Sequence, residues 1–300
     1  MSNRRSFLKL TAAGLATTAL APLTATATAT ATPTATATAT ATANSPLSQP
    51  ASPGPPVPFK LGMAGYTFRE FTVDQAIAMM QRVQVDALSL KDFHLPLSCT
   101  QEEADAVIGK FKAAGIEVYA PGVVYMKTNE EVDRAFACAQ KMKCSMIVGA
   151  PNYELIPYAE QKVKETGIRL AIHNHGPDNP LFPNATDIWK HISKLDARMG
   201  ICLDIGHTTR DGQDPCVDLK KYLSRIFDIH IKDVTQAAKE GTTIEMGRGI
   251  INIPAFVKTL LKTGYSGRCS LEFEKDMKDP LAGIAESLGY FRGVVKTLNT

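Results

Sequence analysis

The sequence predicts an α/β protein built as one (β/α)8 barrel, because strand-like runs recur at a regular spacing with helical stretches between them. Short apolar runs that are typical of β-strands begin near residues 59, 86, 116, 144, 168, 199, 226 and 268. Most of these starts lie about thirty residues apart, as one strand, one helix and their loops require. An open doubly wound sheet is the alternative, but no glycine-rich nucleotide loop follows the first run.

Stretches with apolar residues at helical spacing lie between the strand-like runs, and glycine closes several of them. We expect helices at residues 73–83, 102–115, 129–142, 154–167, 185–195 and 253–264. A last helix, at about residues 280–298, would pack over the closing strand. The chain from residue 59 onward is long enough for one such domain.

The sequence pattern near the N-terminus predicts that the protein is exported. Arg4 and Arg5 are followed by Phe7-Leu8 and an alanine-rich apolar stretch, which is typical of a twin-arginine signal. We expect a signal and Ala/Thr leader at 1–43, a Pro/Ser-rich linker at 44–58 and a TIM-barrel catalytic domain at 59–300. The apolar stretch is short for a bilayer. We therefore expect no stable membrane span in the mature form and a periplasmic or otherwise exported protein.

The charge balance of the predicted domain argues against a nucleic-acid partner. Residues 1–58 carry 3 of the 33 Lys and Arg residues and none of the 30 Asp and Glu residues, so residues 59–300 have thirty of each. Proteins that bind nucleic acid need a basic surface, and the sequence shows no basic stripe. We expect a small-molecule sugar or keto-sugar as partner and no nucleic acid, while the oligomeric state is left open.

Four short strings at the ends of predicted strands carry the functional prediction. They are His173-Asn174-His175, Asp204-Ile205-Gly206-His207, His230-Ile231-Lys232-Asp233 and Glu272-Phe273-Glu274. Parallel barrels keep their chemistry at this end of the strands. A single His or Asp in such a place is more often a cap, but imidazoles and carboxylates that converge from four strands suit a divalent metal.

Strand parity brings members of each string to one cavity, because alternate residues of a barrel strand point inward. If Asp204 points inward, Cys202 does too, and Leu203 packs outward against helices. By the same alternation, the two members of each of three pairs point to the same side of their strand. The pairs are His173 with His175, His230 with Lys232, and Glu272 with Glu274.

The strings HNHG, LDIGH, HIKD and SLEFE, in this order, resemble the sugar phosphate isomerase/epimerase family of xylose-isomerase-like TIM barrels, from about residue 59 to the C-terminus. The resemblance implies one divalent metal ion, Mn2+ first, with Zn2+, Mg2+ or Co2+ as alternatives. It implies that Asp204, His230, Glu272 and residue 173 hold the ion. Many members have glutamate where this chain has His173. We expect His173 to be the ligand, with His175 as the alternative.

The resemblance also implies a metal-dependent sugar isomerase/epimerase that removes a proton next to a carbonyl, which the metal polarises. Glu272 is the expected base. Epimerases of the group use two metal-bound glutamates on opposite faces of the substrate, so His173 weakens that reaction. A metal-dependent lyase or hydratase on 3-keto-glycosides is one alternative, and a non-catalytic sugar-binding barrel is another.

Several residues near the expected metal are candidates for catalysis. His175 would bind a sugar hydroxyl if it is not a ligand. His207 resembles the substrate-contacting histidine of the family, or it caps a loop. Lys232 would supply positive charge to an oxyanion, or it pairs with a nearby acid.

A second group of residues is expected to bind substrate. Lys91 and His94 end the second strand, although a solvated charged loop explains them equally well. Arg248 lies in a Gly-Arg-Gly turn, and Glu274 shares a face with Glu272. Tyr66 and Tyr125 would line a sugar pocket or form the barrel rim.

The predicted export refines the substrate, because phosphorylated intermediates are scarce outside the cytoplasm. We expect an unphosphorylated sugar. Barrel endonucleases that act at damaged DNA are a further reading, but they need a larger metal cluster and a cationic surface, and this neutral domain offers neither.

Overall fold

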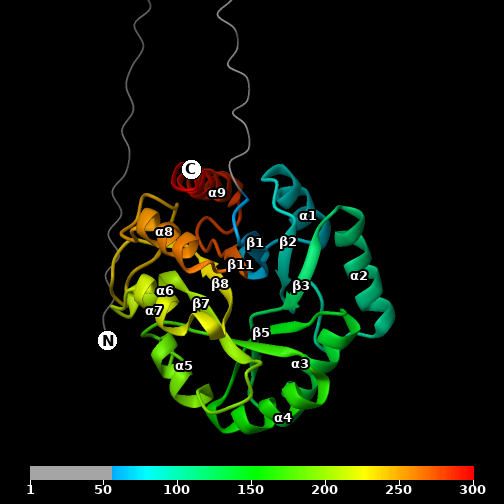
Figure 1. Cartoon of the computed structure of the whole chain (residues 1–300). Helices are drawn as coiled ribbons and strands as arrows, with labels where there is room; N and C mark the ends of the chain where they lie inside the picture. Colours follow the sequence, from blue (N-terminus) through cyan, green and yellow to red (C-terminus); the bar gives the residue numbers. More distant parts are fainter. Residues whose placement is uncertain (1–55) are drawn as a thin grey trace, which may run out of the picture. The chain divides into compact units, whose positions relative to one another are not determined.

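Parallel strands form a barrel at the centre of the domain, and helices surround it (Figure 1). The computed structural model describes residues 56–300, which fall within one compact unit, Ser52–Thr300. The expected leader at 1–43 and most of the expected linker at 44–58 lie outside the described residues. All eight predicted strand positions are strands, and this confirms the predicted barrel.

The barrel sheet runs in the order β3-β2-β1-β11-β8-β7-β6-β5-β4, and its pairings are parallel. The strands are β1 (Lys60–Ala64), β2 (Ala87–Leu90), β3 (Glu117–Pro121), β4 (Val124–Met126), β5 (Met146–Pro151), β6 (Arg169–His173), β7 (Met199–Asp204), β8 (Ile226–Ile231) and β11 (Arg268–Leu271). Parallel strands place all their carboxyl ends at one mouth, which is why the four predicted strings can meet.

The third barrel strand is divided into β3 and β4. β3 pairs with β2, and β4 pairs with β5, so the two halves together close the barrel. Gly122 lies between them, where a Cβ atom would come within 2.6 Å of the Val148 Cβ. A glycine is therefore required for this close approach to β5.

The helices follow the predicted pattern. They are α1 (Val73–Arg82), α2 (Gln101–Ala113), α3 (Asn129–Lys141), α4 (Ile156–Thr166), α5 (Ala185–Ile192), α6 (Ile205–Arg210), α7 (Pro215–Tyr222), α8 (Ile253–Thr263) and α9 (Leu281–Leu298). Thr72 and Thr100 begin α1 and α2 with capping boxes, which satisfy free backbone N–H groups. α4 ends at Gly167, whose φ is 75°, a conformation that glycine adopts without strain.

The sequence did not predict α6 and α7, which lie between β7 and β8, or the short antiparallel pair β9 (Asp233–Val234) and β10 (Thr243–Ile244).

Among residues 56–300, no helix has both the length and the apolar character that crossing a membrane requires.

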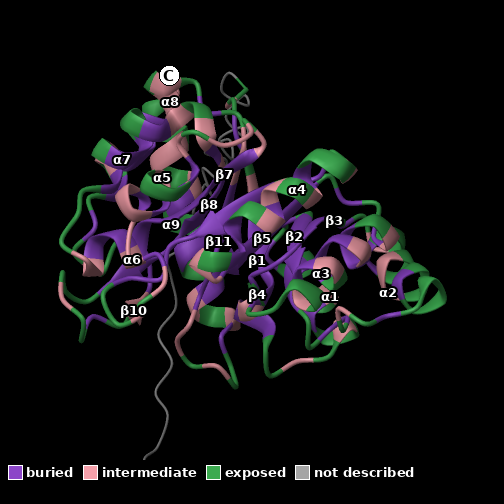
Figure 2. Ribbon diagram, turned by 90° about the horizontal axis from the view of Figure 1, so that it is seen from below, coloured by how far each residue is buried: buried purple, intermediate pink, exposed green. Residues whose placement is uncertain are grey.

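Two apolar layers hold the barrel. A small inner cluster includes Tyr119, Val148 and Cys202, while Leu203 belongs to the large cluster between strands and helices, as strand parity predicts. Figure 2 shows the buried strands at the centre and exposed residues on the outer helices. Cys202 and Leu203 thus fix the face of β7, so that Asp204 at its end points to the barrel axis.

Candidate metal and substrate site

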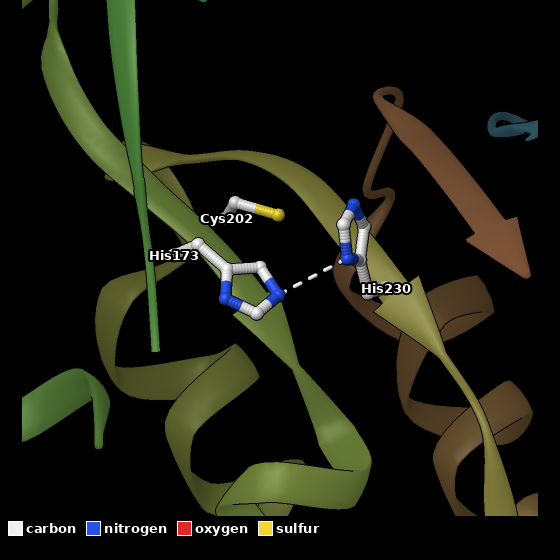
Figure 3. A group of neighbouring side chains, drawn as sticks. All are labelled: His173, Cys202 and His230. Carbon is white, nitrogen blue, oxygen red and sulfur yellow. Dashed lines mark hydrogen bonds between the residues drawn. The ribbon is translucent and has the colours of Figure 1, made fainter. Parts of the chain in front are cut away.

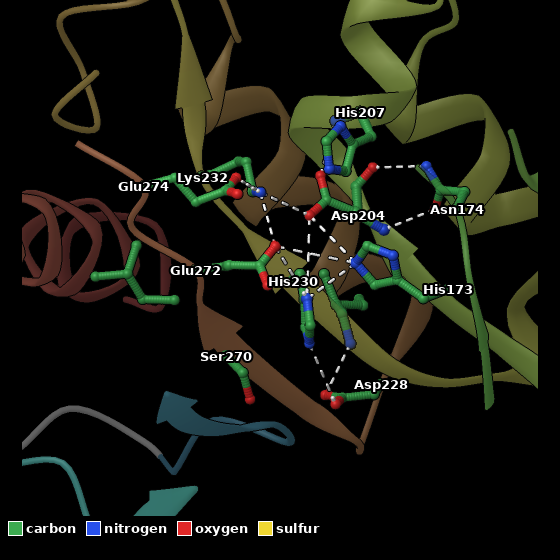
Figure 4. A network of polar contacts seen from close by, with 12 residues as sticks. His173, Asn174, Asp204, His207, Asp228, His230, Lys232, Ser270, Glu272 and Glu274 are labelled. Atoms are coloured by element: carbon green, nitrogen blue, oxygen red, sulfur yellow. Dashed lines mark hydrogen bonds and ion pairs between the residues drawn. The ribbon is translucent and has the colours of Figure 1, made fainter. Parts of the chain in front are cut away.

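Four side chains converge at the carboxyl ends of neighbouring strands. His173 and Asp204 end β6 and β7. His230 lies in β8 and pairs in register with Asp204, and Glu272 directly follows β11. One ligand atom from each of these four residues, here called the quartet, lies within 4.8 Å of the others (Figure 4).

The donor set of the quartet fits a divalent metal ion. His173 Nε2 lies 3.1 Å from His230 Nδ1 and 3.6 Å from Asp204 Oδ2. His230 Nδ1 lies 3.5 Å from Glu272 Oε2. All four residues are buried, and Asp204 Oδ2 forms an ion pair with Lys232 but no well-aligned hydrogen bond. Two imidazoles and two carboxylates are ligands that Mn2+, Zn2+ and Co2+ accept, so the residues present could hold such an ion.

Lys232 places a buried cation against the carboxylates of the site. Its Nζ lies 2.7 Å from Glu272 Oε2, 2.6 Å from Glu274 Oε2 and 3.1 Å from Asp204 Oδ2. Burial alone would raise the pKa of Glu272, but the Lys232 charge and the contact with His230 outweigh it and hold that pKa well below its ordinary value. The opposite charges likewise raise the pKa of Lys232 although burial lowers it. Both groups are therefore charged.

Two further imidazoles face the same space. Neither ring nitrogen of His175 has a hydrogen-bond partner, and its ring lies 4.7 Å from the ring of His173. Burial lowers the pKa of His175 to about 2 and that of His207 to about 3, so both are neutral. His207 Nδ1 lies 3.0 Å from Arg210 Nη1, a neighbour that the sequence reading did not identify.

A cavity of about 350 Å³ opens above the quartet. This volume is in the range of small-molecule sites. The cavity is lined by Tyr66, Lys91, Val123, Tyr125, His173, His175, Asp178, Asn179, His207, Glu272 and Glu274. Of the quartet, His173 and Glu272 reach the cavity. Asp178 and Asn179 were not anticipated, because they lie in the loop after β6 and follow no strand pattern.

A second cavity, of about 420 Å³, lies at the opposite end of the barrel around Lys60, Tyr119 and Arg268. Lys60 and Arg268 begin their strands, so this cavity is at the amino ends. Parallel barrels carry out their chemistry at the carboxyl ends, and the quartet is there. The candidate site is therefore the smaller cavity.

Asn174 clamps the ends of β6 and β7 together. Its side chain accepts a hydrogen bond from Asp204 N at 2.8 Å and donates to Asp204 O at 3.1 Å. It also donates to Thr208 Oγ1 at 3.2 Å. The sequence string contained Asn174 without a role for it. Its opposite parity to His173 and His175 is the signal that it faces a neighbouring strand rather than the cavity.

A buried polar group lies beneath the quartet. Tyr119 donates a hydrogen bond to Asp228 Oδ2 at 2.8 Å and lies 2.7 Å from Ser270 Oγ. Asp228 Oδ2 is 4.0 Å from His230 Nε2, the nitrogen that faces away from the quartet.

Figure 3 shows Cys202 between His173 and His230, and its thiol could serve as a metal ligand together with these imidazoles. Asp228 was not anticipated, although it lies two residues before His230 and thus on the same face.

Asp233 holds the segment that follows β8. Its carboxylate accepts hydrogen bonds from the backbone N–H groups of Val234, Gly247, Gly249 and Ile251, at 2.9, 2.9, 3.0 and 3.1 Å. A Cβ on Gly249 would lie 2.2 Å from Asp233 Oδ1, so this turn needs glycine. One buried carboxylate thus fixes the path of the chain after β8.

The expected substrate residues divide into two pairs. Lys91 and Glu274 line the cavity, and they pair with Asp92 and Lys232. The structure places the other two residues outside the cavity. His94 is buried and lies 2.8 Å from the Phe71 carbonyl, and Arg248 forms an ion pair with Glu286 on the surface. Neither lines the cavity, because each loop side chain has a partner outside it.

Comparisons with known proteins agree with this architecture. The chain is 29% identical over 131 residues to the rhizopine catabolism protein MocC of Rhizobium meliloti, which is 39% of this chain and 40% of that protein. It is 28% identical over 148 residues to an inosose dehydratase of Klebsiella pneumoniae, or 43% of this chain and 49% of that enzyme. The chain thus spans less than half the length of these curated relatives.

A solved structure and a family description extend the likeness over most of the domain. An uncharacterized protein from Parabacteroides distasonis superposes with a TM-score of 0.63 at 28% identity, over 79% of this chain and 99% of that one. Residues 121–294 match the family described as the xylose isomerase-like TIM barrel. With the parallel barrel and the strand-end quartet, this match establishes that the chain belongs to the xylose isomerase-like TIM barrel family.

Proposed function

We propose that the domain is a divalent-metal-dependent lyase of the dehydratase type, which acts on a ketone of an unphosphorylated sugar or polyol. The observation that carries this proposal is that one carboxylate, Glu272, and one imidazole, His173, are the quartet members that reach the cavity. Epimerases of the group that this chain resembles use two metal-bound glutamates on opposite faces of the substrate, and His173 stands here at the position of one of them. The inosose dehydratase relative supports the same choice.

The residues supply the parts that an elimination needs. A divalent ion bound by the quartet would polarise the substrate carbonyl and make the neighbouring C–H bond more acidic. Glu272 lines the cavity as a carboxylate and accepts that proton. The C–O bond on the next carbon then breaks, its electron pair leaves with the oxygen, and a carbon–carbon double bond forms. The departing oxygen takes up one proton, so the products are an unsaturated ketone and water or an alcohol.

The imidazoles and Lys232 orient this reaction. His175 has two free ring nitrogens beside the cavity, so it can hydrogen-bond a substrate hydroxyl or the departing oxygen. His207 reaches the same cavity. Lys232 holds Glu272 at 2.7 Å and thereby fixes the direction of its carboxylate.

A one-base isomerase is the second candidate. In such an enzyme a single carboxylate moves a proton between adjacent carbons, and Glu272 alone suffices for that step. The same metal requirement holds for both reactions, with Mn2+ as the first metal to test and Zn2+, Mg2+ and Co2+ next. A non-catalytic sugar-binding barrel would not need a buried group of two imidazoles and two carboxylates that could hold a metal ion.

Incubation of the Mn2+-loaded protein with keto sugars, inososes and 3-keto-glycosides in deuterated buffer tests the proposal by NMR. An unsaturated ketone supports the lyase, and deuterium beside the carbonyl of an isomeric product would support the isomerase instead. Absence of both products with every ketone contradicts an enzyme of either kind. Glu272→Gln, which keeps the side-chain shape, is expected to lose about 10²–10⁴-fold in rate.

We also propose that the protein is exported through the twin-arginine pathway, which supports an unphosphorylated substrate. The basis is the Arg4-Arg5 pair before an apolar stretch. Replacement of both arginines by lysine should leave the full-length chain in the cytoplasm, as cell fractionation and immunoblotting would show. An unchanged distribution would argue against this route.

A further inference from the structure

A second hollow lies beside the candidate site. It has a volume of about 620 Å³, larger than the cavity above the quartet. It is lined by Asp92, Phe93, Pro96, Leu97, Ser98, Tyr125, Lys127, Glu131 and Arg134, which come from the loop after β2, from β4 and from the start of α3. We call it the aromatic groove. Tyr125 lines both spaces, so the two are neighbours across one side chain.

Tyr125 is held in place by residues of the candidate site. Its ring lies 5.2 Å from the ring of His175, and Lys91 Nζ lies 5.9 Å from its centroid. The side chain nevertheless remains 45% exposed. A substrate that lies against His175 would therefore continue past Tyr125 into the groove if it were longer than one sugar ring.

Phe93 is a second aromatic surface of the groove. It is 43% exposed, although burial of such a side chain is favourable. The ring of His94 packs against it at 4.7 Å in an edge-on arrangement, and His94 Nε2 is anchored 2.8 Å from the Phe71 carbonyl. The loop thus keeps Phe93 at the surface. An exposed ring in this position can pack against the apolar face of a sugar ring.

The groove carries charges of both signs. Lys127 and Arg134 are cationic, Glu131 is anionic, and Asp92 is paired with Lys91. A neutral ligand with many hydroxyls suits this set, because hydroxyl oxygens accept hydrogen bonds from Lys127 and Arg134 while hydroxyl O–H groups donate to the carboxylates.

We propose that the aromatic groove binds a second sugar ring, so that the substrate is a keto sugar with a glycosidic substituent rather than a free monosaccharide. This inference rests on the proposed function. The keto ring lies above the quartet, and the C–O bond that breaks is the glycosidic bond. Its electron pair stays on the oxygen of the second sugar, which takes up a proton and leaves on the groove side of Tyr125.

Kinetics with a matched pair of substrates tests the proposal. The pair consists of a 3-keto-disaccharide and the methyl 3-keto-glycoside that lacks the second ring. We expect kcat/KM for the disaccharide to exceed that for the methyl glycoside at least tenfold. Phe93→Ala should reduce this ratio about tenfold, with the loss mainly in KM. Tyr290→Ala, which removes a 37% exposed aromatic ring on α9, is the matched control and should leave the ratio unchanged.

Binding to the metal-free wild-type protein, which cannot turn over under the proposed function, is measured by saturation-transfer NMR and separates this inference from that function. Binding of the second ring that Phe93→Ala weakens would support the groove even if no elimination occurs with any substrate. Equal binding of the two ligands, or a ratio unaffected by Phe93→Ala, would overturn the groove proposal while elimination from the methyl glycoside still supported the lyase.

Discussion

Lys232 Nζ and Glu272 Oε2 lie 2.7 Å apart, and both side chains are buried. The same ammonium also lies 3.1 Å from Asp204 Oδ2 and 2.6 Å from Glu274 Oε2. One positive charge thus offsets part of the repulsion among three carboxylates, at the position where the quartet could hold a cation. A bound cation would add positive charge at the same place, so we expect the lysine and the cation to stabilise the domain in the same way.

Replacement of Lys232 should show how much the stability of the domain depends on this positive charge. Lys232→Met leaves buried carboxylates without their partner, and we expect the metal-free protein to lose about 3–5 kcal/mol of unfolding free energy. Mn2+ should restore more stability to this variant than to the parent, because it supplies the missing charge. Urea unfolding with and without Mn2+ measures the difference.

The control for this change is Lys110→Met, which removes an exposed lysine from its pair with the exposed Asp74. It should cost less than about 1 kcal/mol, independently of the metal. An equal effect of Mn2+ on Lys232→Met and on the parent would contradict the role given to Lys232.

Asp228 should raise the metal affinity of His230. The carboxylate lies 4.0 Å from Nε2 of the imidazole, and a proton held on Nε2 leaves the lone pair of Nδ1 free for a metal. We expect Asp228→Asn to raise the Kd for Mn2+ about 10–100-fold. Isothermal titration measures the affinity, and ¹⁵N NMR of the histidines reports the tautomer.

The matched control is Asp218→Asn, which makes the same chemical change at a buried aspartate of α7. Its metal affinity should equal that of the parent. A wild-type Kd in Asp228→Asn would show that Asp228 contributes to folding alone.

Asp218 itself should make stability depend on pH. Burial raises its pKa from 3.8 to about 6, and its Oδ2 has no hydrogen-bond partner. The folded protein therefore binds the proton more tightly than the unfolded chain, so this residue favours folding at low pH. Its contribution is lost as the pH rises from about 4 through about 6 and stays lost above that. Asp218→Asn should stabilise the protein at pH 7 and have little effect at pH 4, as thermal unfolding at the two values would show.

Removal of the metal should lower both the activity and the thermal stability of the protein. Chelation of the purified protein should abolish turnover and lower the melting temperature, since an ion bound to the folded state stabilises it by mass action. Re-addition of Mn2+ should restore both quantities. Unchanged turnover after verified metal removal would exclude a metal-assisted reaction.

The strand-end positions of the fold could be predicted because they depend on local patterns. Apolar runs about thirty residues apart located each barrel strand except β4, and parallel strands then bring His173, Asp204, His230 and Glu272 to one mouth. α6 and α7 were harder to find, because they are only six and eight residues long and carry little apolar periodicity. The division of the third strand at Gly122 follows from a tertiary contact with Val148, which no local pattern reports.

The side chains of the loops could not be predicted in the same way. His94 and Arg248 are polar residues next to strand ends, yet their partners are the Phe71 carbonyl and Glu286, which are distant in sequence. The inward direction of Asp228 could be predicted from strand parity, because it lies two residues before His230. Its hydrogen bond with Tyr119 could not, because the two residues are 109 positions apart in sequence. Strand direction and parity therefore predict which residues meet, whereas loop contacts decide which of them face the ligand.

The Asp233 carboxylate has a consequence for how this site changes over evolutionary time. Because it holds four backbone amides at once, an insertion or a bulky residue between 234 and 251 would break several bonds together. The segment from 234 to 251 is therefore constrained, while the loop after β2 carries the exposed Phe93 ring and the loop after β4 carries the exposed Lys127. New ligand preferences in descendants of this chain should therefore arise in those two loops, with the metal-binding side retained.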